Sequence, residues 1–230
     1  MKTSFVLCCL TVALSMSFFG CGPGSTAAGA TEETTSVSEA LTATLPANAT
    51  DIIISGSVTI GIYRYSAGTA MLKGPPFPPT YIAFVQRTTL NQIPPPSVYQ
   101  LIVQGSYDRP VVSIAKGADG QLAFAATRKP NMSGSSPTFI TLARLDPLTL
   151  TTVASSSLAA PRNGTNPPTA TIALGSIVFT VPGDLFVTGT KDGSIPGELG
   201  LVGGGHFQAT YAAFASSTTL GLAPTQVLAW

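Results

Sequence analysis

An internal repeat limits the folds open to this chain more than any other feature of its sequence. Thr80–Leu90 and Thr210–Leu220 are identical at seven of eleven positions, and Thr138–Leu150 follows the same pattern with two residues inserted. In all three segments large apolar residues alternate with small or polar ones, which is the period of a strand that buries one face. Such a repeat indicates an array of similar supersecondary units.

A second element precedes each copy of the first. Gly56–Arg64, Gly120–Arg128 and Gly183–Lys191 each begin with glycine, carry large apolar residues at their third and fifth positions, and have a basic residue at the ninth. Both elements have the pattern of strands, and they recur in the same order. They predict a domain at 51–230 made of three units of about four strands each, at about 51–105, 106–165 and 166–230.

Turn signals separate the expected strands. Asp119-Gly120 and Asp146-Pro147 are typical of turns, and the Pro- and Gly-rich stretches 73–79 and 129–137 are incompatible with helix. The sequence therefore predicts an all-β fold. Four-stranded units in series resemble degenerate β-propeller blades, without the WD40 or kelch signatures, so the resemblance implies a partial propeller-like array. Three units also fit a β-trefoil or a β-prism, or a propeller that is completed by self-association or shortened by truncation.

The last expected strand lies at the end of the sequence. Gln226–Trp230 closes the third unit, and no further unit follows to cover it. An unpaired strand edge is a template for association. We therefore expect Val227, Leu228 and Trp230 to pack against the first unit or against another chain.

The first twenty residues have the pattern of a secretory leader. Lys2 supplies a positive charge, and Ser4–Phe19 is apolar but too short for a membrane-spanning helix of about 20 residues. Phe18-Phe19-Gly20-Cys21 then resembles the lipobox of bacterial lipoproteins. The resemblance implies that residues 1–20 are a signal peptide and that Cys21 is lipidated. The chain would then be held on the extracytoplasmic side of the cell envelope, in the bacterial outer membrane or at the cell surface. Ordinary cleavage near Gly22 would instead release a soluble secreted protein.

A low-complexity segment separates this cysteine from the domain. Residues 21–50 are rich in Ser, Thr, Ala and Gly and have almost no large apolar side chains. Such a composition cannot bury a core and is typical of a flexible tether. We expect the segment to join the lipid to the β-domain.

Charge and cysteine content exclude several classes of function. Charged residues make up 9% of the chain, against about 25% in typical soluble domains. The net charge of +1 provides no basic field for the phosphates of a nucleic acid. Cys8 and Cys9 lie in the leader, so Cys21 would be the only cysteine of the mature chain. A disulfide within the chain and a cysteine metal cluster are excluded, and we expect no metal site and no cofactor.

Three basic residues are the candidates for a ligand site. Arg64, Arg128 and Lys191 hold the same position in the second repeated element. If the units surround a common axis, these bases would form a ring suited to an anionic ligand. The alternative is that each base simply ends its strand in solvent.

Catalytic groups are sparse. His206, the one histidine, follows three glycines but lacks the partners that a metal site or a hydrolase triad needs. Glu198 with Asp192 or Asp184 would suit the two-carboxylate chemistry of a glycosidase. The turn contexts of the aspartates favour a role in capping their own backbone.

Together these features predict a lipid-anchored, extracytoplasmic β-repeat module with a non-catalytic binding or scaffold role. Its expected partners are the membrane, through the N-terminal lipid, and a protein, a glycan or a second copy of the chain, but not nucleic acid. The alternatives are a carbohydrate-active hydrolase and a fragment of a longer propeller.

Overall fold

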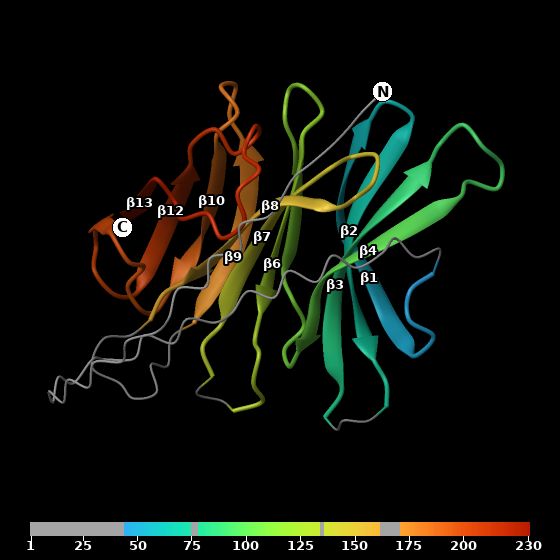
Figure 1. Ribbon diagram of the computed structural model, residues 1–230. Coiled ribbons are helices and arrows are strands. Elements are labelled where there is room, and N and C mark those ends of the chain that lie inside the picture. Colours follow the sequence, from blue (N-terminus) through green and yellow to red (C-terminus); the bar gives the residue numbers. More distant parts are fainter. Residues whose placement is uncertain (1–43, 75–77, 134–135, 162–170) are drawn as a thin grey trace, which may run out of the picture. The chain divides into compact units, whose positions relative to one another are not determined.

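A computed structural model describes residues 44–74, 78–133, 136–161 and 171–230, all within one unit that spans Ser36–Trp230 (Figure 1). These residues form thirteen strands and no helix, so the predicted all-β fold is confirmed. Within the same ranges, nothing long, helical and apolar enough to span a bilayer is found. The predicted leader, Cys21 and most of the predicted tether lie outside the described residues.

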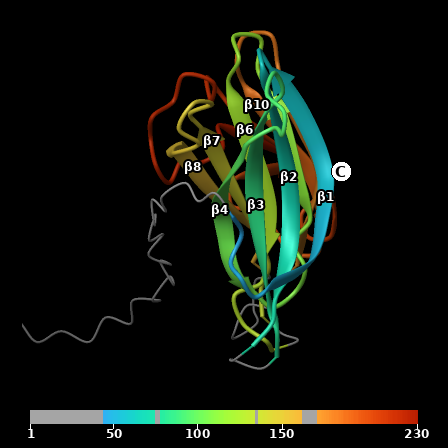
Figure 2. The same cartoon turned by 90° about the vertical axis from the view of Figure 1, so that its right-hand side faces the viewer.

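The strands form three sheets, each built from consecutive strands of the chain. The first sheet is antiparallel and follows chain order: β1 (Ala49–Ile60), β2 (Tyr63–Leu72), β3 (Thr80–Thr89) and β4 (Ser97–Ser106). Figure 2 shows these four strands side by side. The second sheet has the same simple order: β5 (Val112–Lys116), β6 (Leu122–Arg128), β7 (Phe139–Leu145) and β8 (Thr152–Ala159).

The third sheet has a fifth strand. Its antiparallel part is made of β9 (Ile172–Phe179), β10 (Leu185–Lys191), β12 (Gly205–Tyr211) and β13 (Gln226–Ala229). The short β11 (Glu198–Gly200) comes from the connection between β10 and β12 and pairs in parallel with β13. No closed barrel is formed by the described sheets.

The second sheet is buried on both faces, as the residues of β6 show. Leu122 and Phe124 belong to one apolar core, which they share with Tyr65 of the first sheet. Ala123 and Ala125 belong to another core, which includes Phe207 of the third sheet. Because successive residues of a strand point to opposite faces, a strand between two cores must be apolar throughout.

Arginine side chains on two of the strands bind the neighbouring sheet. Arg87 of β3 donates to the carbonyl of Leu148, in the turn between β7 and β8. Arg144 of β7 donates from Nε to the carbonyl of Ser217, in the connection between β12 and β13, at 2.8 Å. Each of these two bases therefore fixes a turn of the next sheet.

The two segments with the best sequence match do not share a structure. Thr80–Leu90 is almost entirely β3, whereas Thr210–Leu220 holds the end of β12 followed by a turn. In this turn Ala213 has a φ of 51°, and its carbonyl accepts hydrogen bonds from the N–H groups of Ser216 and Ser217. A chain rich in Ala, Ser and Thr produces identical residues without a common conformation. The sheets do not show repeated blade units, and they differ in strand number and strand length.

The second repeated element, which ends in a basic residue, also covers different parts of the three sheets. Gly120–Arg128 and Gly183–Lys191 each contain a turn glycine and then the second strand of a sheet, but Gly56–Arg64 runs from the end of β1 into β2. In the first sheet the glycine in the turn is Gly61, which has a φ of 58° and lies five residues later. This element therefore does not align the first sheet with the other two, and the predicted unit boundaries stay a prediction.

The last strand is not an edge strand. β13 lies between β12 and β11, so the expectation that this strand would leave an unpaired edge is wrong. Val227 is buried in the core shared with the second sheet, whereas Leu228 and Trp230 are exposed. The sequence did not reveal β11 because three residues are too few to show a strand period.

Candidate functional site

The site with the densest polar contacts lies where β10 ends. Leu185 and Val187 face the core, and strand alternation places Lys191 on the same face. The Lys191 side chain is completely buried, with 0% of its surface exposed. Because burying an isolated ammonium is very costly, it must be surrounded by compensating oxygens.

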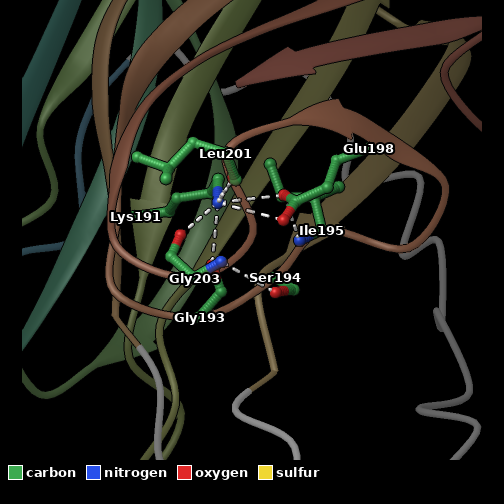
Figure 3. Close-up of polar contacts among 7 residues, drawn as sticks. All are labelled: Lys191, Gly193, Ser194, Ile195, Glu198, Leu201 and Gly203. Carbon is green, nitrogen blue, oxygen red and sulfur yellow. Dashed lines mark hydrogen bonds and ion pairs between the residues drawn. The ribbon is translucent and has the colours of Figure 1, made fainter. Parts of the chain in front are cut away.

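Five oxygen atoms surround the Lys191 ammonium (Figure 3). Three are backbone carbonyls from the following loop: Gly193 at 3.1 Å, Leu201 at 3.3 Å and Gly203. The other two belong to the carboxylate of Glu198, with Oε2 at 3.0 Å and Oε1 at 3.2 Å. We call this arrangement the lysine cage.

The carboxylate of Glu198 is also closed off from water. Its side chain is 4% exposed, and its Oε2 accepts a hydrogen bond from the Ile195 N–H at 2.8 Å. Burial raises the pKa of Glu198, but hydrogen bonds from Ile195 and Ser194 oppose this effect. With the charge of Lys191, they hold the pKa of the carboxyl below its ordinary value.

The lysine cage fastens the connection between β10 and β12. This connection, residues 192–204, contains β11, and Glu198 is the first residue of that strand. Residue pairing of Glu198 with Val227 and of Leu199 with Leu228 sets the register of β11 against β13. Since the ammonium binds oxygens along the connection, it holds β11 in place and so covers the outer side of β13.

The chemistry of the cage is structural. A nucleophilic lysine must lose its proton and reach a substrate, whereas Lys191 is paired with a carboxylate and has no exposed surface. An anionic ligand would have to displace Glu198 to reach it. The sequence offered one signal for this role: Lys191 continues the inward-facing positions of Leu185 and Val187 along β10.

The other two predicted ligand-site bases lie elsewhere. Arg64 is the second residue of β2, is exposed, and is paired in register with Thr59 and Thr88. Arg128 is the last residue of β6, is half-buried, and is paired with Phe139. Arg64 therefore lies at the start of its strand, whereas Arg128 and Lys191 lie at the ends of theirs. The three bases do not hold equivalent positions in the sheets.

The carboxylates of the hydrolase alternative make structural bonds. Asp184 Oδ1 accepts a hydrogen bond from the Ala213 N–H at 2.7 Å, and Asp192 Oδ1 accepts one from the Thr171 N–H. Their expected partner, Glu198, lies in the lysine cage and not in an open cleft.

Asp146 shows the same capping role in a turn. Its Oδ1 accepts hydrogen bonds from the N–H groups of Thr149 at 2.7 Å and Leu148 at 2.9 Å. The Thr149 bond is the largest of the effects that lower the pKa of Asp146, against a smaller opposing effect of burial. This arrangement is the side-chain capping that the Asp-Pro sequence predicted.

His206 is an exposed residue of β12 whose ring stacks on Trp230. The ring centroids are 6.3 Å apart, with 22° between the planes. Among the described residues, no group of three or more His, Cys, Asp or Glu side chains could hold a metal ion.

An open hollow of about 400 Å³ lies between the β1–β2 and β5–β6 turns. Lys116, which lines it, donates to the Thr59 carbonyl at 3.0 Å.

Comparisons of the chain with protein-family models, curated proteins and solved structures find no match.

Proposed function

We propose that this chain is an exported, lipid-anchored β-module that binds a ligand or acts as a scaffold without catalysis. The lipobox-like Phe18–Cys21 segment supports the anchor, because Cys21 would be the only cysteine left after cleavage. The lysine cage is the observation that supports a role without catalysis. Lys191 and Glu198 have the least exposed side chains of the described ion pairs, and they hold a loop in place.

A finer architecture belongs to the same proposal. In it the domain is a partial, propeller-like array of three units. The simple chain order of the strands in the first two sheets supports this idea. The parallel β11 in the third sheet is then an addition to one unit, and the module presents loops and outer faces to its partner.

The anchor is tested by replacing the cysteine. Cys21→Ala should move the protein from the detergent phase to the aqueous phase, or block its processing, because no lipid could be attached. Cys9→Ala is the matched control, since that residue lies in the leader, and it should partition as the wild type does. If wild type and Cys21→Ala are equally soluble in the aqueous phase, the lipid anchor is excluded.

A further inference from the structure

The last part of the domain is almost free of charge. From Gly193 to Trp230, Glu198 is the only Asp, Glu, Lys or Arg residue, and its carboxylate is buried in the lysine cage. Soluble domains carry about one charged residue in four. This stretch therefore presents no exposed charged side chain.

Six large apolar side chains are exposed on the same stretch, and all of them except Leu220 lie on or next to β11 and β13. Leu199 and Leu228 are paired in register across β11 and β13. Leu201 follows β11 and donates its N–H to the carbonyl of Ala229 at 2.9 Å, next to Trp230. The side chains of the three leucines, Trp230 and Val202 are 38–72% exposed. We call them the insert patch: Leu199, Leu201, Val202, Leu228 and Trp230.

Several backbone groups beneath the insert patch have hydrogen-bond partners within the domain. The carbonyls of Leu201 and Gly203 accept from Lys191, and the Gly203 N–H donates to Ser194 Oγ at 3.0 Å. Unpaired backbone groups are very costly in a hydrocarbon environment. Because these groups are already paired, they add little to the cost of moving the loop out of water.

We propose that the side chains of the insert patch insert into the boundary between the headgroups and acyl chains of a lipid bilayer. Its aliphatic side chains and single Trp match the apolar side of interfacial membrane contacts. Protein interfaces are enriched in Tyr, Met and Arg as well, and none of these contributes to the patch. The three-residue β11 is also too short to pair with a strand of a partner.

The patch would fix the orientation of the domain on the membrane, a role that rests on the proposed lipid anchor. Between Cys21 and Thr44, the first described residue, lie 22 residues, which reach at most about 75 Å when extended. A lipid at the end of such a segment brings the domain near a bilayer without orienting it. A second contact supplies the orientation.

Trp230 is the only tryptophan of the chain, so its fluorescence reports on the patch alone. The test uses full-length Cys21→Ala, which cannot be lipidated at that residue, with phosphatidylcholine vesicles that carry brominated acyl chains. We expect the Trp230 emission to shift to shorter wavelength and to be quenched. Val202→Asp, on an exposed loop, should abolish both effects, whereas Val181→Asp, at an even more exposed position in the β9–β10 turn, should leave them unchanged.

Each other outcome overturns the proposal in a different way. A spectral shift that depends on protein concentration without vesicles would assign the patch to a second copy of the chain. Quenching that persists in Val202→Asp would mean that the leader, and not the patch, brings the domain to the bilayer. If the Trp230 emission does not shift at all, the proposed contact between the patch and the bilayer is excluded. The proposal of a lipid anchor is unaffected, because it is tested separately by the partitioning of the wild type.

Discussion

Arg128 and Lys191 end the second strands of their sheets, yet their surroundings differ completely. Lys191 is sealed among five oxygens, whereas Arg128 is half-buried, and its Nε has no hydrogen-bond partner in the described part of the chain. The loop after Lys191 supplies Glu198 and three carbonyls. After Arg128, the neighbouring Lys129 pairs with Asp108, whose side chain is 65% exposed. The difference teaches that the loop, and not the strand, decides whether a base at this position is buried.

Removing the buried base should have the largest effect. Lys191→Met leaves the Glu198 carboxylate buried without its counter-charge and three carbonyls without their donor. We expect a loss of about 3–5 kcal/mol in the free energy of unfolding, measured by denaturant titration. Arg128→Met, the matched control, should lose less than about 1 kcal/mol. Similar losses in both variants would remove the distinction between the two strand ends.

Acid should weaken the lysine cage through Glu198. The pKa of this carboxyl is held below its ordinary value in the folded chain, so the folded state binds its proton less readily than the unfolded state does. The resulting stabilisation is present above the ordinary pKa of about 4.3 and is lost as the pH falls through the folded-state pKa. Glu198→Gln should therefore destabilise the domain at pH 7, and the difference from wild type should shrink as the pH falls below about 4. A difference that stays constant from pH 7 to the acid range would show that the charge of Glu198 is irrelevant.

The all-β fold could be predicted from the sequence because it depends on local features. The alternation of apolar and polar residues and the Asp-Gly and Asp-Pro turns depend only on residues close together in the sequence. The capping role of Asp146 followed from its turn sequence. The repeat misled the alignment of the sheets, because Thr210–Leu220 matches β3 in sequence but turns after Tyr211. A few small residues leave conformation to be decided by tertiary contacts.

The lysine cage could be predicted only in part. The strand period places Lys191 on the inner face of β10, but its burial depends on a loop that folds back over it. The partner, Glu198, is seven residues away, and the carbonyls come from Gly193, Leu201 and Gly203. Backbone carbonyls leave no trace in a sequence, so the convergence of this loop on one ammonium could not be inferred.

A double-mutant cycle on Lys191 and Glu198 tests the central claim most directly, namely that these two side chains act together to hold the β11 connection. The free energy of unfolding is measured for wild type, Lys191→Met, Glu198→Gln and the double variant at pH 7. We predict a coupling energy of about 2 kcal/mol or more, because either single change leaves a buried group without its partner. Single effects that add to within about 0.5 kcal/mol would contradict the account, since additivity is the behaviour of independent residues.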